Sequence, residues 1–333
     1  MKKLSLLFIS VLLTALAASA QKPDSFYGMW SLEIEGGSIG WLHVFENDGV
    51  LDAELLWRWG SVLPVQNVFL ADDNNLVVMR AGEVMRKDRN GKDRKMIVPH
   101  VFEITRSGDR ISGISLEPAR NGMAATKMKF YGWKLPSVPS KPDLSQVKYG
   151  KPIKLFNGKD LAGWKLLDPN QVNGFKVEKG ILVNDPVQKQ GERVSYGNIR
   201  TEEVFGDFNL TLEVNVPQGS NSGVYLRGMY EIQVMDSYGK EPDSHNMGAL
   251  YSRITPSQAA EKPAGEWQSM DITLVDRHVT VKLNGTTIID NQPVYGPTGG
   301  AISGDVFKKG PIYLQGDHGK VSYRNIVLTP VLK

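Results

Sequence analysis

Short runs in which apolar and polar residues alternate cover residues 25–135. In the clearest run, Trp30, Leu32 and Ile34 are separated by polar residues, and a later run contains Phe130. Alternation with a period of two places apolar side chains on one face of a β-strand. Between the runs lie residues that favour tight turns, namely Asn47-Asp48-Gly49, Asp72-Asp73-Asn74-Asn75, Arg89-Asn90-Gly91 and Ser107-Gly108-Asp109. The pattern predicts a small antiparallel β-barrel or sandwich over residues 25–135.

The first predicted strand opens with Gly28-Met29-Trp30. This start resembles that of a lipocalin-type barrel, in which the tryptophan closes one end. One Gly-x-Trp sequence is equally compatible with a strand of an ordinary sandwich, so both architectures stay open.

A second series of alternating runs follows residue 150 and extends to the C-terminus. The apolar members of these runs are Phe208, Leu210, Leu212, Val214, Val216, Ile272, Leu274, Val279, Val281 and Leu283. Asn284-Gly285 then favours a hairpin turn. No long amphipathic helix is indicated. We therefore expect residues 150–333 to form a second all-β domain, a sandwich.

The segment between the two domains is rich in proline. Pro136, Pro139 and Pro142 fall within seven positions. Proline lacks a backbone donor and favours extended backbone, so the segment 136–149 is expected to be a semi-rigid linker.

The first twenty residues have the pattern of a cleavable signal peptide. Lys2 and Lys3 precede an apolar stretch from Leu4 to Leu16, and Ala18-Ser19-Ala20 is a small-residue cleavage site. The apolar stretch is shorter than the about 20 residues that a membrane span needs. We expect an exported protein, periplasmic or secreted, without a membrane span.

The amino-acid composition excludes several kinds of catalytic group and of binding partner. The 333 residues include no cysteine, which excludes disulfides, thiol nucleophiles, cysteine-ligated metals and a lipid-modified cysteine. Without Lys2 and Lys3, 37 basic residues face 36 acidic ones, so no basic surface that would attract nucleic acid is expected. Catalysis would have to use oxygen and nitrogen side chains.

One predicted sheet face concentrates polar residues of the types that recognise sugars. With a period of two, Tyr225 and Arg227 share a face, and Glu231 and Gln233 share one beyond the Gly228 corner. The strand around residues 311–319 repeats the scheme with Tyr313, Gln315 and Asp317-His318. An ordinary wet face of an antiparallel sheet is the alternative interpretation.

Several motifs in this domain resemble those of the 3-keto-disaccharide hydrolase family, in family order. They are Leu155-Phe156-Asn157-Gly158-Lys159-Asp160-Leu161-Ala162-Gly163-Trp164, Asn221 to Arg227 continuing to Tyr230–Asp236, Gly265-Glu266-Trp267-Gln268, Leu314-Gln315-Gly316-Asp317-His318-Gly319 and Tyr323-Arg324-Asn325-Ile326. The resemblance covers about residues 150–332. Gln268 and the extra Gly316 depart from the usual family pattern and affect local geometry. Residues 25–135 lie outside the resemblance.

The resemblance implies a concanavalin A-like jelly roll and activity as a 3-keto-glucoside 1,2-lyase or 3-keto-2-hydroxyglucal hydratase on oxidised disaccharides or glucosides. We expect His318, Glu231 and Arg227 to be catalytic. The expected substrate-binding residues are Tyr225, Gln233, Asp236, Asn221, Gln315, Asp317, Trp267 and Tyr251. A divalent metal ion held by Glu231 and His318 is a further candidate, which the absence of a His-x-His spacing leaves open.

Two other features are weaker candidates. Trp57 and Trp59 would share a strand face and could stack on a sugar or belong to the barrel core. His245 lies in a loop that could reach the rim of a site. A non-catalytic, lectin-like protein is the alternative function, because a jelly roll does not determine activity. An ordinary glycoside hydrolase is disfavoured, because no Glu-x-Asp-x-x-Glu pattern lies on a strand. The oligomeric state is left open.

Overall fold

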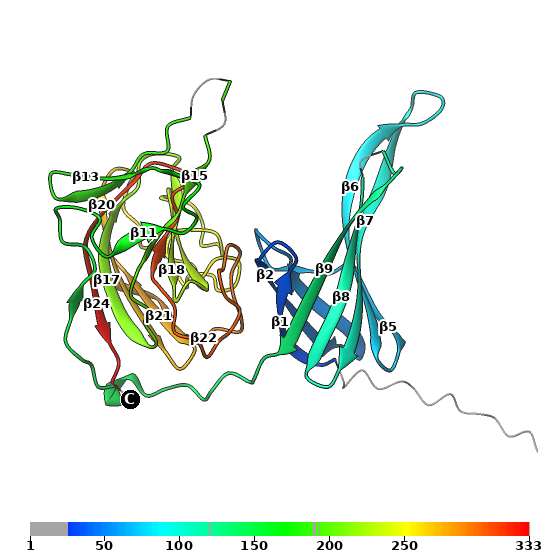
Figure 1. The fold of residues 1–333 in the computed structure, drawn as a ribbon, viewed down its shortest axis with the longest axis horizontal. Helices are drawn as coiled ribbons and strands as arrows, with labels where there is room; N and C mark the ends of the chain where they lie inside the picture. Colours follow the sequence, from blue (N-terminus) through cyan, green and yellow to red (C-terminus); the bar gives the residue numbers. More distant parts are fainter. Residues whose placement is uncertain (1–25, 120, 189–190, 193, 333) are drawn as a thin grey trace, which may run out of the picture.

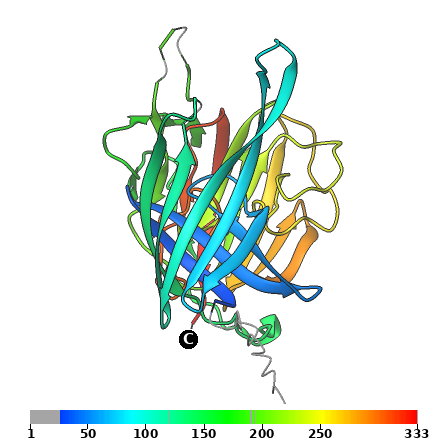
Figure 2. The ribbon, with the colours of Figure 1, turned by 90° about the vertical axis from the view of Figure 1, so that its right-hand side faces the viewer.

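The computed structural model describes residues 26–119, 121–188, 191–192 and 194–332. Figure 1 shows two β-rich domains side by side, joined by an extended segment along one edge, and Figure 2 shows the first domain in front of the second. The expected signal peptide, residues 1–20, lies outside the described residues. Among the described residues, no helix has the length and apolar character needed to cross a membrane.

The first domain is one antiparallel sheet of nine strands in the order β4-β3-β2-β1-β9-β8-β7-β6-β5. Its strands are β1 (Gly28–Ile34), β2 (Ser38–Asn47), β3 (Val50–Leu56), β4 (Leu63–Pro64), β5 (Asn67–Asp72), β6 (Asn75–Lys87), β7 (Asp93–Ser107), β8 (Arg110–Pro118) and β9 (Ala125–Lys134). The sheet curls until β3 and β5 lie against each other. It encloses one apolar core, so the barrel-like alternative describes it better than two packed sheets.

The alternation read from the sequence explains this core. Trp30, Leu32 and Ile34 of β1 are buried as predicted, and Trp30 donates its indole N–H to the Phe26 carbonyl at 2.8 Å. Asp48 adopts a φ of 50° in the turn between β2 and β3, a left-handed conformation that asparagine, aspartate and glycine tolerate best.

The second domain has two main antiparallel sheets. The larger has the order β13-β14-β24-β17-β20-β21-β22, with β10 also pairing with β24, and the smaller has the order β11-β16-β23-β18-β19. The larger sheet consists of β10 (Ile153–Lys154), β13 (Phe175–Glu178), β14 (Ile181–Asn184), β17 (Phe208–Asn215), β20 (Trp267–Val275), β21 (His278–Leu283), β22 (Thr286–Pro293) and β24 (Val321–Pro330). The smaller consists of β11 (Trp164–Leu166), β16 (Ile199–Thr201), β18 (Asn221–Leu226), β19 (Tyr230–Met235) and β23 (Tyr313–Leu314). A short parallel pair, β12 (Val172–Asn173) and β15 (Tyr196–Gly197), completes the domain.

One apolar core fills the space between these two sheets. Strict alternation of buried and half-buried residues along β17 shows why, because every second side chain of that strand faces the other sheet. The chain is therefore all-β, and the second domain is the predicted jelly-roll sandwich. One face of the smaller sheet is left for the site described below.

The linker is attached to the second domain by hydrogen bonds. The Arg277 guanidinium donates to the carbonyl oxygens of Pro136 and Ser137, at 3.0 and 3.3 Å. The Asn291 amide donates to the Pro142 carbonyl at 2.9 Å. After the prolines, a single 3-10 turn, η2 (Leu144–Gln146), leads into the second domain.

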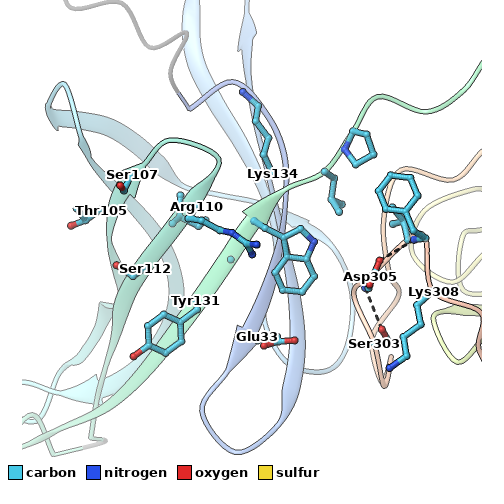
Figure 3. A pocket seen from close by; sticks show the side chains of 17 residues that line it. Glu33, Thr105, Ser107, Arg110, Ser112, Tyr131, Lys134, Ser303, Asp305 and Lys308 are labelled. Atoms are coloured by element: carbon cyan, nitrogen blue, oxygen red, sulfur yellow. Dashed lines mark hydrogen bonds between the residues drawn. The ribbon is translucent and has the colours of Figure 1, made fainter.

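The two domains also pack directly on each other. Trp41 and Leu56 of the first domain form an apolar cluster with Leu135 and with Val306 of the second. The Arg253 guanidinium lies over the Trp41 ring, 4.2 Å from its centroid. Beside this cluster lies a groove of about 760 Å³ between the outer face of β8–β9 and the segment 303–308 (Figure 3).

Candidate active site

Three side chains form a row across the smaller sheet of the second domain. β18 lies between β19 and β23, and the register places Tyr225 directly opposite Glu231 on one side and Tyr313 on the other. Directly opposed residues on neighbouring strands share a face. The two tyrosine rings stack with centroids 3.8 Å apart and planes 13° from parallel. On the same face, Gln233 lies opposite Gly223, which leaves space beside the Glu231 carboxyl group.

This row lines a pocket of about 660 Å³, a size suited to a small ligand. The pocket brings together most of the predicted site residues, namely Asn221, Tyr225, Glu231, Gln233, Tyr251, Gln315, Asp317 and His318. The period-two interpretation of β18, β19 and β23 is therefore right for the position of these side chains.

Glu231 is buried at the back of the pocket, with 4% of its surface exposed. Burial disfavours its charged form and raises the pKa of Glu231 to about 8. The Tyr225 hydroxyl lies 2.7 Å from Glu231 Oε2 and also 2.7 Å from the Gly299 carbonyl oxygen. One hydroxyl has one hydrogen, so both contacts are satisfied when a protonated Glu231 donates to Tyr225 and Tyr225 donates to Gly299. This arrangement and the burial of Glu231 both favour its protonated form near neutral pH.

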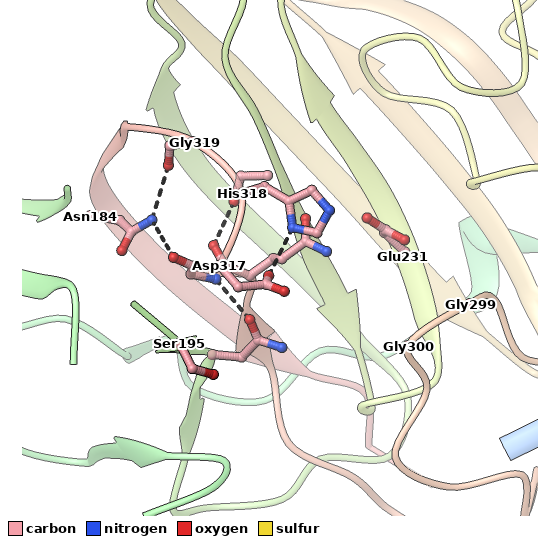
Figure 4. Close-up of polar contacts among 12 residues, drawn as sticks. Asn184, Ser195, Glu231, Gly299, Gly300, Asp317, His318 and Gly319 are labelled. Carbon is pink, nitrogen blue, oxygen red and sulfur yellow. Dashed lines mark hydrogen bonds and ion pairs between the residues drawn. The ribbon is translucent and has the colours of Figure 1, made fainter. Parts of the chain in front are cut away.

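His318 and Asp317 form a hydrogen-bonded pair at the mouth of the pocket. His318 Nδ1 donates to Asp317 Oδ1 at 2.8 Å, and about half of each side chain is exposed. This hydrogen bond to Asp317 raises the pKa of His318, against an opposing effect of burial. With its proton on Nδ1, the neutral imidazole presents the lone pair of Nε2 as an acceptor. Figure 4 shows His318 and Glu231 near each other, and both line the pocket.

Two asparagine side chains form hydrogen bonds with the backbone of the loop that carries this pair. Asn184, fully buried at the end of β14, donates its amide to the carbonyls of Gly316 and Gly319 at 3.1 and 3.0 Å (Figure 4). The Gly316 N–H in turn donates to the Asn198 side chain at 2.8 Å. The backbone on both sides of His318 is therefore fixed, which restricts where the imidazole can lie.

Arg227 is not where the sequence placed it. It does not line the pocket, and its buried guanidinium donates to the backbone carbonyls of Val306 and Lys308. The reason is local: β18 ends at Leu226, and Arg227 begins the turn with a φ of 55°. Strand alternation stops at that turn, so the expected face is wrong for this residue.

Two other predicted residues also lie outside the pocket. Asp236 follows the end of β19 and accepts the Gly219 N–H at 2.9 Å. Trp267 lies on β20 in the larger sheet, where the Arg324 guanidinium is 4.0 Å from its ring centroid. Neither residue is part of the lining of the pocket that contains Glu231.

The two tryptophans of the first domain differ in position: Trp57 belongs to the barrel core, and Trp59 is exposed at the pocket. Trp57 is buried against Phe102 and Phe130 in the barrel core, whereas Trp59 is 66% exposed and lines the pocket. His245 packs edge-on against Tyr251, with ring centroids 4.9 Å apart, and so lies behind a lining residue.

Sequence reasoning missed several contributions to the pocket, from both domains. Asn198 and the backbone of Gly299-Gly300 come from segments without a motif of polar alternation. The turn Gly36-Gly37 and the segment from Arg58 to Gly60 come from the first domain, which the family resemblance leaves out. Only the Trp57–Trp59 pair gave a signal for that contribution.

The predicted metal ligands do not form a ligand set. Within the described part of the chain, no three His, Cys, Asp or Glu side chains are arranged to hold a metal ion. Glu231 is engaged by Tyr225, and the Nδ1 of His318 is engaged by Asp317. The residues present thus do not fit the metal site that the sequence suggested, and no step of the chemistry below uses one.

Comparison with family models gives one match over more than half of the chain. Residues 151–329 match the 3-keto-alpha-glucoside-1,2-lyase-like domain. The chain belongs to this family. Membership in the 3-keto-alpha-glucoside-1,2-lyase-like family covers the second domain, with its whole Glu231–His318 constellation, and makes the protein a carbohydrate-active one. No curated protein matches the chain.

Solved structures of similar proteins cover a little more than half of this chain. Two candidate glycosyl hydrolases from Parabacteroides distasonis are 30% and 24% identical and cover 56% and 55% of this chain. They are themselves covered to 92% and 94%, each with a TM-score of 0.43. A non-specific endo-β-1,3(4)-glucanase of family GH16 is 12% identical, with coverage of 58% of this chain and 92% of that one and a TM-score of 0.35.

Proposed function

We propose that this protein is an exported enzyme that cleaves 3-keto-glycosides, such as oxidised disaccharides, by β-elimination and hydrates the 3-keto-2-hydroxyglucal that results. The observation that carries the proposal is the pairing of a neutral, buried Glu231 with the His318–Asp317 pair in one pocket. A base and an acid of different environments, side by side, are what a proton-transfer reaction needs. Family membership of residues 151–329 supports a carbohydrate substrate, and the 3-keto class is part of this proposal.

His318 is the proposed base. A ketone at C3 of the sugar acidifies the proton on C2, so a nearby base can remove it. Nε2 of His318 would take that proton while the C–H electron pair forms the enolate between C2 and C3. Asp317 holds the imidazole in the tautomer that leaves Nε2 free and stabilises the imidazolium that forms.

Glu231 is the proposed acid. The enolate expels the C1 substituent, so that a C1=C2 double bond forms, the ketone returns and the C1–O bond breaks. The leaving oxygen then needs a proton, which a carboxyl group with a pKa of about 8 holds at neutral pH. Tyr225 would stabilise the carboxylate left behind, because its hydroxyl can turn from the Gly299 carbonyl to Glu231.

Hydration reverses these roles. The carboxylate of Glu231 would accept a proton from water as its oxygen adds to C1, and the imidazolium of His318 would return a proton to C2. The two groups are then restored to their starting forms, so elimination and hydration form one closed cycle.

A direct test compares a 3-keto-glucoside with its unoxidised parent. The wild type is expected to consume only the keto sugar, and Glu231→Gln and His318→Ala are expected to lower kcat at least about 100-fold. Glu178→Gln, an exposed carboxylate on β13 outside the pocket, is the matched control and should keep full activity.

Two results would overturn the proposal. Full activity in both pocket variants would remove this site from the reaction. Binding of either sugar by the wild type without turnover would support the lectin-like alternative instead. The export part is tested separately by the N-terminus of the mature protein, expected at Gln21.

A further inference from the structure

The pocket of the family domain is completed by the first domain. Its lining includes the turn between β1 and β2 and the segment Arg58-Trp59-Gly60 that follows β3. These residues lie outside the family match, which begins at residue 151. They form one rim of the pocket that contains Glu231 and His318.

Backbone contact fixes this rim against the catalytic row. A Cβ atom added to Gly299 would lie 2.2 Å from the Gly60 carbonyl oxygen, so the two backbones touch. On its other side, the Gly299-Gly300 segment accepts the hydroxyl hydrogen bonds of Tyr225 and Tyr313, each at 2.7 Å. The Gly299-Gly300 backbone therefore contacts Gly60 on one side and accepts hydrogen bonds from Tyr225 and Tyr313 on the other, so a shift of Gly60 would also displace these tyrosines.

Hydrogen bonds hold the next residues of the same segment. The Ser61 hydroxyl lies 2.8 Å from His245 Nε2, and His245 Nδ1 lies 2.8 Å from Asp243 Oδ1. The order of atoms is that of a Ser-His-Asp triad, but the Val62 N–H that would follow the nucleophile in an oxyanion hole donates to Ser252 Oγ at 3.0 Å. The arrangement therefore ties the two domains together, which leaves the Trp59 segment with little freedom.

Trp59 is the large apolar group of this rim. Its ring is 66% exposed, and the Arg58 guanidinium lies 4.6 Å from its centroid. Arg58 itself has a φ of 65°, a strained backbone for a non-glycine residue, and its guanidinium contacts Met128 Sδ at 3.1 Å. An exposed indole beside a polar pocket offers a flat apolar surface for the C–H face of a sugar ring.

We propose that Trp59 and Arg58 form a subsite for the second sugar ring of the substrate, the one that leaves from C1. The assignment of the stacked ring as the leaving group rests on the proposed function. The stacking of a sugar ring on Trp59 is independent of that function. The keto ring would occupy the space between Glu231 and His318, and the leaving ring would lie on the indole with the Arg58 guanidinium donating to its hydroxyls. The first domain thereby selects disaccharides over glycosides with a small leaving group.

The kinetic test compares Trp59→Ala with the wild type on a 3-keto-disaccharide and on methyl 3-keto-glucoside. Loss of stacking should raise KM for the disaccharide about two- to tenfold, and it should affect the methyl glycoside much less. Trp59→Phe should restore most of the loss. Phe307→Ala removes another highly exposed aromatic ring, which lines the separate groove beside β8–β9. It is the matched control and should leave KM and kcat for both substrates unchanged.

Two results would overturn the subsite: equal loss on both substrates, or no change on either. A binding measurement tests the subsite independently of the proposed chemistry, because it does not require turnover. In saturation-transfer NMR, the unoxidised disaccharide should show contact with the wild type, and Trp59→Ala should weaken the signal from the leaving ring. That result holds even if the wild type turns over no keto sugar, and its absence from the wild type would reject the subsite.

Discussion

The Tyr225 hydroxyl lies 2.7 Å from the Glu231 carboxyl group, on the directly opposed position of the neighbouring strand. Donation from this hydroxyl to the ionised Glu231 carboxylate lowers the pKa of Glu231, although burial dominates and raises it to about 8. Tyr225 therefore adjusts how readily Glu231 releases its proton.

Tyr225→Phe is expected to move the alkaline limb of the pH–rate profile. Without the hydroxyl, the pKa of Glu231 rises further, so the acid stays protonated to higher pH and the limb shifts upward. At neutral pH kcat should fall about 10- to 100-fold, because the carboxylate formed in the reaction loses its donor. A kcat profile between pH 6 and 10 measures both effects. An alkaline limb that does not move would show that it does not report the titration of Glu231.

The raised pKa of Glu231 also predicts how stability depends on pH. Between its ordinary value of 4.5 and about 8, the folded protein holds a proton that the unfolded chain releases. The free energy of unfolding then falls as pH rises across this window, by up to about 1.4 kcal/mol per pH unit from this group. Glu231→Gln lacks this term, so its stability relative to the wild type should rise from pH 5 to pH 8.

Urea unfolding of both proteins at several pH values measures that difference. Other titrating groups are common to the two proteins and cancel to a first approximation. Glu178→Gln serves as the control for the chemical change itself, because Glu178 is exposed and lies outside the pocket. A constant difference for Glu231→Gln would contradict a neutral Glu231.

Asp317→Asn is expected to shift the acidic limb of the profile. The carboxylate of Asp317 raises the pKa of His318, so its removal lowers that pKa and the neutral base persists to lower pH. The acidic limb should move down while kcat falls, because asparagine no longer stabilises the imidazolium. The kcat/KM profile from pH 5 to 8 provides the measurement. An acidic limb that does not move would show that it does not report on His318.

Gly299→Ala is expected to disturb the two domains together. The new methyl group would collide with the Gly60 carbonyl, and relieving the clash should cost about 1–3 kcal/mol of stability. Activity should fall too, because the displaced segment holds the Tyr225 and Tyr313 hydroxyls. Gly82→Ala on β6 is the matched control, since a Cβ there meets nothing within 4 Å. Thermal unfolding and kcat of the two variants decide the matter.

The sequence predicts strands well where one face is buried. Along β17, alternation alone identifies the core face, and the same rule puts Tyr225, Glu231 and Gln233 on one side of the smaller sheet. The rule says nothing beyond the end of a strand. Arg227 lies one residue past β18 in a left-handed turn, and its face could not be deduced from parity.

Contacts between segments that are distant in the sequence are the second kind of feature that could not be predicted from it. Neither the approach of Gly60 to Gly299 nor the bond from Ser61 to His245 has a local signature, because each depends on how two separately folded sheets meet. Trp57 and Trp59 illustrate the result. Their spacing suggested a shared face, yet β3 ends at Leu56, so one ring enters the core and the other faces the pocket.

The hydrogen bonds from Arg277 and Asn291 to the linker carbonyls restrict how products can leave. Three linker carbonyls, of Pro136, Ser137 and Pro142, are bonded to the second domain, and the apolar cluster around Trp41 and Val306 opposes separation of the domains. Opening of the pocket by movement of whole domains is therefore disfavoured. We therefore expect sugars to exchange with solvent past the exposed Trp59 and the half-exposed His318 of the pocket lining, where the proposed leaving-ring subsite lies.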